Sequence, residues 1–214
     1  MKNLSFGRAA LLGLVAGAMF LVAGCNKAPS AAAGDDMSQG DPKAKITVVE
    51  YASVACPICG RVNDTIMPEF KKRYIDTGKV HYIYRPMMTG NPSVATAGHL
   101  LAACAGKDKY FSVIDAVMRS QQEMDAGGPP EQYTNARPVL LNIAKSVGID
   151  ADAFTKCVSD PKAIEHLNDL NQQYLTKDGI EGTPTFFVNG KKVTGIPNDI
   201  SYFDDAIKNA PAAK

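Results

Sequence analysis

Residues 46–59 read ITVVEYASVACPIC and carry the strongest indication of the fold. Residues 46–51 have the composition of a strand, and Cys56-Pro57-Ile58-Cys59 then opens a long helical pattern. A strand here delivers Cys56 to the edge of a sheet, and the helix start sets its sulfur against unpaired backbone N–H groups and the positive end of the helix dipole. Both effects favour the thiolate, which is the attacking and leaving group of disulfide exchange. The stretch therefore has the layout that a redox-active dithiol needs.

Two further features make the motif more specific than a lone CxxC. Pro57 suits the first position of a helix, where a missing N–H costs nothing, and the two intervening residues let Cys59 reach Cys56 within one turn. A Thr183-Pro184 pair follows far downstream, immediately before another strand-like run. Strand, CxxC, helix and Thr-Pro together indicate a redox protein.

The N-terminal residues have the character of an export signal. A basic start is followed by an apolar stretch, residues 9–23, that is too short for a comfortable membrane span. It ends in Val22-Ala23-Gly24-Cys25, which resembles the lipobox of bacterial lipoproteins, in which the cysteine is acylated and becomes the new N-terminus. The alternatives are an ordinary signal peptide cut nearby or an uncleaved anchor. Asn26 after the cysteine resembles the sorting signal for the outer membrane.

The region after Cys25 divides into a tether and one domain. Residues 26–40 are rich in Ala, Ser, Gly and Asp and are predicted to form a flexible tether. Residues 41–214 have enough apolar content for a core of their own. Removing residues 1–24 takes two of the 23 basic residues, which leaves 21 against 22 acidic residues. A charge near −1 gives no signal for binding nucleic acid or an acidic membrane surface.

Export also affects how the cysteines are interpreted, because disulfides persist outside the cytoplasm. With Cys25 lipidated, four cysteines remain, and four allow three connectivities. The CxxC spacing makes 56–59 the natural first pair, which leaves Cys104 and Cys157 as a structural disulfide across about fifty residues. Two buried free thiols are the alternative for that second pair.

The periodicity of the chain predicts an α/β fold with a mixed sheet. We expect strands near 46–51, 79–85, 185–188 and 191–193, the last two joined by an Asn189-Gly190 turn. The first two strands should be parallel because a helix connects them. That helix should kink at Pro68. A helical insertion should span about 92–177, with helices near 93–105, 108–122, 138–147, 151–158 and 161–177, and a last helix near 199–208.

These pieces together resemble the DsbA-like thiol-disulfide oxidoreductases of the thioredoxin superfamily. The matching features are Asp41-Pro42 before the strand, Glu50, the Cys56–Cys59 motif, the helical insertion, and the run GTPTFFVNG at residues 182–190. The resemblance implies a thioredoxin fold with an inserted helical domain. It covers nearly all of residues 41–214.

The resemblance also implies roles for the site residues. Cys56 would be the nucleophile and Cys59 the resolving thiol, and Pro184 would be cis and lie beside them. Thr183 would offer backbone groups to an extended substrate, with Pro57 and Ile58 also in the substrate-binding surface. The alternatives for the CxxC are an inert disulfide or a metal site, although one CxxC supplies only two ligands.

Glu50 shares strand parity with Ile46 and Val48 and is predicted to face the interior. Related enzymes carry a buried acid under the disulfide, thought to move the proton of the resolving thiol, and a partly solvated strand-edge glutamate is the alternative. The three histidines, His81, His99 and His166, are isolated in the sequence and are interpreted as structural or surface residues.

The resulting hypothesis is an exported, lipid-anchored, monomeric oxidoreductase of the bacterial periplasm. It would introduce disulfides into exported proteins, be reoxidised by a quinone-linked DsbB-type membrane protein, and need no cofactor or metal. The Pro57-Ile58 dipeptide differs from the Pro-His of the strong oxidase, which predicts a weaker oxidant. A periplasmic reductase or isomerase and a non-catalytic peptide-binding lipoprotein are the alternatives.

Overall fold

A computed structural model describes residues 36–125 and 134–212 of the chain. Its centre is a five-stranded mixed sheet with the strand order β1-β3-β2-β4-β5. The strands are β1 (Met37–Gln39), β2 (Ile46–Ala52), β3 (Val80–Pro86), β4 (Thr185–Val188) and β5 (Lys191–Lys192). β2 and β3 are parallel, whereas β4 is antiparallel to both β2 and β5. The predicted thioredoxin fold with a mixed sheet is confirmed.

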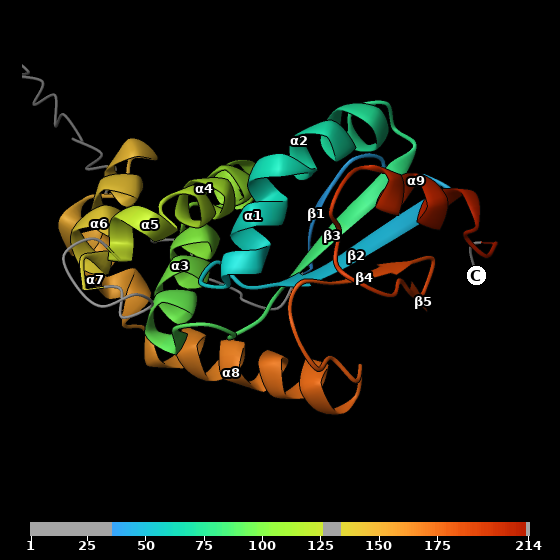
Figure 1. Ribbon diagram of the computed structural model, residues 1–214. Coiled ribbons are helices and arrows are strands. Elements are labelled where there is room, and N and C mark those ends of the chain that lie inside the picture. Colours follow the sequence, from blue (N-terminus) through green and yellow to red (C-terminus); the bar gives the residue numbers. More distant parts are fainter. Residues whose placement is uncertain (1–35, 126–133, 213–214) are drawn as a thin grey trace, which may run out of the picture.

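The other regular elements of the described chain are helices. α1 (Pro57–Thr65), α2 (Met67–Phe70) and the π-helical η1 (Lys71–Ile75) connect β2 to β3. The insertion between β3 and β4 consists of α3 (Pro92–Cys104), α4 (Lys107–Arg119), α5 (Gln121–Asp125), α6 (Ala136–Ser146), α7 (Ala151–Val158) and α8 (Pro161–Thr176). α9 (Ser201–Lys208) follows the sheet. Figure 1 shows α1 between the sheet and the block of helices α3 to α7.

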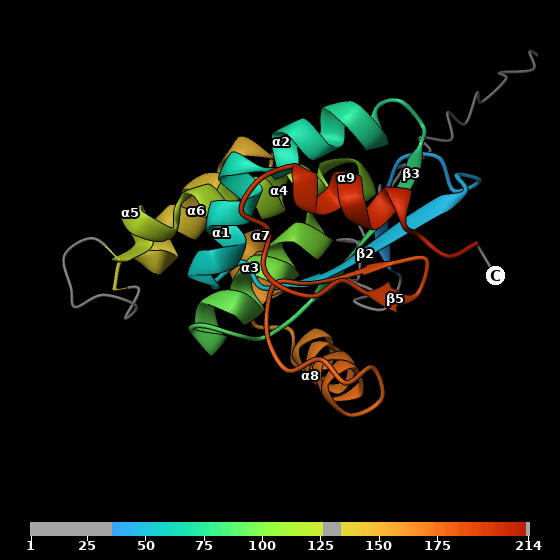
Figure 2. The ribbon, with the colours of Figure 1, turned by 45° about the vertical axis from the view of Figure 1, so that its right-hand side comes forward.

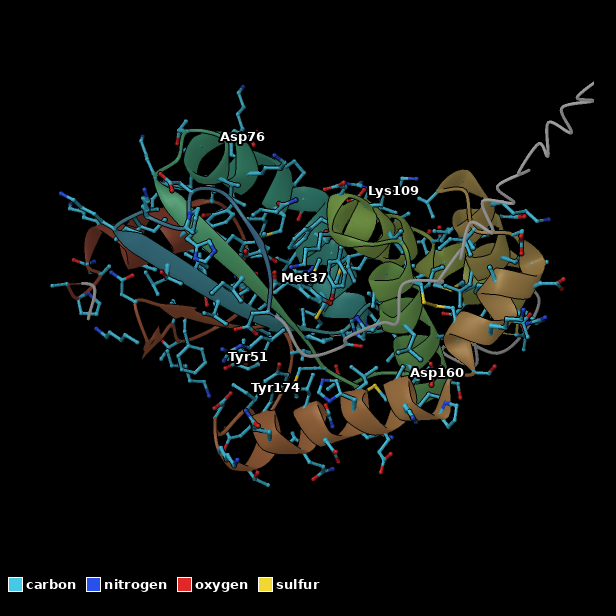
Figure 3. The ribbon with its side chains drawn as sticks, turned by 180° about the vertical axis from the view of Figure 1, so that it is seen from behind. Met37, Tyr51, Asp76, Lys109, Asp160 and Tyr174 are labelled. Carbon is cyan, nitrogen blue, oxygen red and sulfur yellow. A yellow bond between two sulfur atoms is a disulfide. The ribbon has the colours of Figure 1, made fainter. Side chains whose placement is uncertain are left out.

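The two faces of the sheet pack against different helices, as strand alternation requires. Val48, Tyr82 and Phe186 belong to the large core, which includes Phe70 of α2 and Phe203 of α9. Tyr51 faces the other way and packs with Tyr174 of α8 in a smaller cluster. Figure 2 shows α2 and α9 on one side of the sheet and α8 on the other. Figure 3 shows Tyr51 and Tyr174 near each other where α8 meets the sheet, and their ring centroids are 5.2 Å apart.

The prediction of a flexible tether is wrong for its C-terminal end. Residues 26–40 were expected to be unstructured, but Met37–Gln39 form β1 and pair antiparallel with Tyr82–Tyr84 of β3. The segment carries little apolar character of its own, so its pairing depends on the open edge of β3, which only the tertiary structure provides. The predicted export signal, residues 1–24, and the rest of the predicted tether, up to residue 35, lie outside the described residues.

Two of the predicted helices are each divided into shorter helices. The kink expected at Pro68 is a full break at Ile66, because a proline cannot donate an N–H and its ring crowds the carbonyl four residues earlier. The helix predicted over 108–122 ends at Arg119, and α5 begins anew at Gln121. Residues 126–133, between the helices predicted over 108–122 and 138–147, lie outside the described residues. None of the helices in the described ranges combines the length and apolar character needed to cross a membrane.

Candidate functional site

The start of α1 positions the CxxC motif. Cys56 is the N-cap residue in an extended conformation, Pro57 takes the first helical position, and the Cys59 N–H points at the Cys56 Sγ at 3.5 Å. Cys56 is 7% exposed and Cys59 is 1% exposed, and both are free thiols in this structure. Both cysteines are thus buried, and Cys56 is slightly more exposed than Cys59.

The pKa values of the two thiols are shifted in opposite directions. A hydrogen bond from the Cys59 thiol lowers the pKa of Cys56 most, and Thr183 and the N–H groups of Cys59 and Ile58 add to it. Together they outweigh burial and bring the pKa of Cys56 to about 5. Burial raises the pKa of Cys59 well above its usual value, and the adjacent Cys56 raises it further. At neutral pH Cys56 is thus a thiolate and Cys59 a thiol, which is the division that nucleophile and resolving thiol require.

The Thr183-Pro184 segment lies against Cys56, although 127 residues separate them. The peptide bond between these two residues is cis, as expected, and the Thr183 carbonyl oxygen lies 3.5 Å from the Cys56 Sγ. The Thr183 hydroxyl contacts the hydroxyl of Thr89, in the loop after β3. Ser53 ties the same loop to the residues before the motif, because its hydroxyl donates to the Thr89 carbonyl at 2.7 Å.

Apolar side chains are exposed around the motif. Ile58 is 39% exposed, and Pro57 beside it is exposed as well. Ile196 is 43% exposed in the loop before α9, and Arg61 of α1 holds that loop by donating to the Pro197 carbonyl at 3.3 Å. The predicted substrate-binding residues Pro57, Ile58, Thr183 and Pro184 are therefore brought to one site with Cys56.

Glu50 is buried beneath this site. It lies on the central strand β2, it is 4% exposed, and the Tyr82 hydroxyl donates a hydrogen bond to its carboxylate. Burial is the largest cause of its raised pKa of about 7; the Tyr82 hydrogen bond opposes the rise, and Cys56 adds to it. The prediction that Glu50 faces the interior is confirmed, and the partly solvated alternative is wrong. A carboxyl that titrates near neutral pH below a dithiol is suited to exchange protons with it.

We expect Glu50→Gln to stabilise the reduced protein at alkaline pH. The folded-state pKa is raised from 4.5 to about 7. The buried carboxyl therefore does not lower the free energy of unfolding below pH 4.5, and it lowers it increasingly as the pH rises to 7. Above pH 7 the cost is about 3 kcal/mol, at 1.36 kcal/mol for each pKa unit. Glutamine stays neutral and keeps an acceptor for Tyr82. Urea unfolding should therefore show a gain of about this size at pH 8.5 and almost none at pH 4.5. Glu165→Gln, at an exposed position of α8, is the control, and equal effects at the two pH values would contradict this assignment.

The second cysteine pair is bonded. Cys104 of α3 and Cys157 of α7 form a disulfide across 53 residues, so the alternative of two free thiols does not describe this structure. Cys157 packs with Leu100, Ala163 and Leu167 where α3, α7 and α8 meet. The histidines lie apart from the thiols: His99 is buried with its Nε2 on the Met87 carbonyl at 3.1 Å, His81 is half-buried and His166 is exposed. In the described residues no three His, Cys, Asp or Glu side chains are grouped to hold a metal ion.

Sequence reasoning missed two residues of the site. Thr89 contacts Thr183, and Gln121 of α5 donates to the carbonyls of Val54 at 2.8 Å and Cys56 at 3.1 Å. Neither of them belongs to a motif or a charged cluster. Their contacts join segments far apart in the chain, for which a single sequence carries no local signal.

Comparisons with known proteins agree with this geometry. A family model described as thioredoxin matches residues 32–209. A putative protein-disulfide oxidoreductase of Rickettsia bellii is 36% identical over 157 residues, which are 73% of this chain and 58% of that protein. The chain thus spans little more than half the length of this relative.

Solved structures give the same result. The crystal structure of Wolbachia pipientis alpha-DsbA1 is 28% identical, with a TM-score of 0.72 over 83% of this chain and 91% of that chain. The structure of oxidised BdbD from Bacillus subtilis is 23% identical, with a TM-score of 0.66 over 81% of this chain and 91% of that chain, and it bears on the fold alone. The chain belongs to the thioredoxin family and is a DsbA-like member of it.

Proposed function

We propose that this protein is a thiol-disulfide oxidoreductase that works through Cys56 and Cys59. The observation that carries the proposal is the unequal pair of thiols at the start of α1, one with a pKa of about 5 and one buried and protonated. The cis-Pro184 loop beside Cys56 supports it, since the Thr183 backbone can pair with an extended chain there. The similarity to alpha-DsbA1 and to the putative oxidoreductase of Rickettsia agrees with this activity.

The reaction in the oxidase direction moves two electrons from a substrate to the protein. A substrate thiolate attacks Cys56 in the 56–59 disulfide, and Cys59 leaves and takes up a proton. A second substrate thiolate then attacks the substrate sulfur of the mixed disulfide and displaces Cys56 as a thiolate. The product side is the dithiol seen in this structure, and its stabilised Cys56 thiolate favours reaction in this direction.

The strength of the oxidant depends on how far the Cys56 thiolate is stabilised. Thioredoxin has a reduction potential of about −270 mV. We expect the wild-type protein to have a higher potential than this, but a lower one than an enzyme with a Pro-His dipeptide. A potential at or below that of thioredoxin, measured by equilibration with glutathione, would support the reductase or isomerase alternative instead. The redox state of the 56–59 pair in cells gives the direction of electron flow directly.

We expect Ile58→His to make the protein a stronger oxidant. A polar or cationic side chain beside Cys56 lowers its pKa further and stabilises the reduced form. The equilibrium with glutathione should shift about tenfold toward the dithiol, or about 30 mV. Leu175→His adds a histidine at another exposed position, on α8, and should leave the equilibrium unchanged. An Ile58→His protein with the wild-type potential would show that the dipeptide does not set the redox poise here.

We also propose that the protein is exported to the periplasm and held there by a lipid on Cys25, with the outer membrane favoured. The supporting feature is the Val22-Ala23-Gly24-Cys25 sequence after the apolar stretch. The substrates would be exported proteins with unpaired cysteines, and a quinone-linked DsbB-type protein would reoxidise the monomer.

Cys25→Ser tests the anchor. The variant should be found as a soluble periplasmic protein or as an uncleaved precursor, because serine cannot carry the thioether-linked lipid. Detergent partitioning and the mass of the mature chain distinguish these species from the lipidated one. A variant that still partitions into detergent at the lipidated mature mass would refute the assignment.

A further inference from the structure

The residues that lead into the CxxC motif are enclosed by the helical insertion and the loop before it. Val54 packs closely on Gly98 of α3, because a Cβ added at Gly98 would lie only 2.7 Å from the Cγ2 of Val54. Gly90, with φ of +79°, brings the loop before α3 so near that a Cβ would lie 2.1 Å from the Ala55 carbonyl oxygen. The backbone before Cys56 is therefore held by tertiary contacts, and its position depends on how these segments are seated.

Gln121 makes the polar contact between this backbone and α5. Its Nε2 donates to the carbonyl oxygens of Val54 at 2.8 Å and Cys56 at 3.1 Å. Both neighbours are acceptors, so the amide nitrogen must face them and the amide oxygen must face away. Val54 is fully buried. Removing this donor would take a hydrogen bond from a buried carbonyl, which lowers the free energy of unfolding.

Gly60 of α1 makes room for the amide of Gln121. A Cβ at Gly60 would lie 2.9 Å from the Oε1 and 3.1 Å from the Nε2 of Gln121. The Gly60 N–H also donates to the Cys56 carbonyl at 3.0 Å, so that oxygen accepts from α1 and from Gln121 together. A glycine in the first turns of a helix lowers helix propensity, and here it admits the side chain of another segment.

We propose that Gln121 is a positioning residue that couples the helical insertion to the reactivity of Cys56, with Gly60 providing the space for its amide. This inference rests on the proposed thiol exchange function. Gln121 does not touch the sulfur; it acts through the carbonyls on both sides of Ala55.

The expected effect on Cys56 has a definite sign. The amide hydrogens of Gln121 place positive charge against the Cys56 carbonyl and offset the negative end of that peptide dipole near the thiolate. They also hold the backbone that aims the Ile58 and Cys59 N–H groups at the sulfur. Loss of the amide should therefore raise the pKa of Cys56, destabilise the dithiol relative to the disulfide and make the protein a weaker oxidant.

Two near-isosteric variants test the donor. Gln121→Met removes the amide, and Gln121→Glu replaces it with a carboxylate that faces two carbonyl oxygens. The pKa of Cys56, followed by thiolate absorbance, should rise in both variants. The glutathione equilibrium should move about threefold toward the disulfide in the first and about tenfold in the second. Gln122→Glu adds the same charge at the next, exposed position of α5 and should change neither quantity.

A double-mutant cycle tests the role of Gly60. Gly60→Ala should displace the Gln121 amide and raise the pKa of Cys56 as Gln121→Met does. In a Gln121→Ala background, Gly60→Ala should have no further effect on this pKa, because the crowded side chain is gone. Additive effects of the two substitutions would contradict a shared contact.

The outcomes separate this inference from the proposed function. If wild-type Cys56 has an ordinary thiol pKa and forms no mixed disulfides, the proposed function fails. If the wild-type protein exchanges thiols with a low Cys56 pKa, but Gln121→Met and Gln121→Glu keep that pKa and potential while they fold, the inference alone is overturned. Thermal melts of each variant show whether it is folded.

Discussion

Cys56→Ala is expected to abolish exchange with glutathione disulfide, whereas Cys59→Ala should trap a single glutathione on Cys56. Wild-type Cys56, with a pKa of about 5, is almost entirely thiolate at pH 7, while burial keeps Cys59 protonated. Cys59→Ala removes the hydrogen bond that lowers the pKa of Cys56 most, but Thr183 and the N–H groups of residues 58 and 59 still lower it. Only the thiolate attacks a disulfide, so the rate of glutathione addition should be about tenfold or more higher in Cys59→Ala than in Cys56→Ala. Mass spectrometry of acid-quenched samples measures both rates.

Two features of this experiment make it decisive. Both variants keep the 104–157 disulfide, so an adduct mapped to the peptide that carries residues 56–59 reports on the motif. With Cys59 removed no resolving thiol lies beside the adduct, and the mixed disulfide should persist. Equal rates in the two variants would contradict the proposal that Cys56 is the nucleophile. No adduct on either would support the peptide-binding alternative over an enzyme.

Removing the second disulfide is expected to cost about 4 kcal/mol of stability while leaving the redox site in place. The chain-entropy model gives this figure for a closed loop of 53 residues. The disulfide joins α3 to α7, and Cys157 packs on residues of α3 and α8. The Cys104→Ala/Cys157→Ala variant should therefore melt at a temperature lower by roughly 10 °C, if 1 kcal/mol corresponds to 2–4 °C in a domain of this size.

The control for stability is Cys56→Ala/Cys59→Ala, which removes the other two thiols and keeps the structural bond. Comparing the two variants by urea unfolding separates the contribution of the disulfide from the loss of cysteine side chains. The pKa of Cys56 should change little in the Cys104→Ala/Cys157→Ala variant, because among the described residues Cys157 packs with Leu100, Ala163 and Leu167 and not with the thiols of the motif. A melting temperature equal to that of the wild type would refute the structural role.

The features that could be predicted from the sequence are those whose physical cause is local. The run before Cys56, the CxxC spacing and Pro57 at the helix start predicted a strand that delivers a dithiol to the N-terminus of α1, and the structure has this arrangement. The Asn189-Gly190 turn, at which both residues have positive φ, likewise predicted the β4–β5 hairpin. Strand parity was enough to direct Glu50 inward, because side chains alternate along any strand.

Which distant segments meet at the dithiol could not be predicted and depends on the packing of the whole chain. The pairing of β1 with β3 depends on an edge formed by residues more than forty positions away. The contacts of Thr89 with Thr183 and of Gln121 with Val54 and Cys56 join residues 65 or more positions apart. The size of the pKa shift at Glu50 likewise depends on how completely neighbouring elements exclude water from it. Periodicity reports which face of an element is apolar, but the packing of whole elements selects the side chain that meets a given backbone atom.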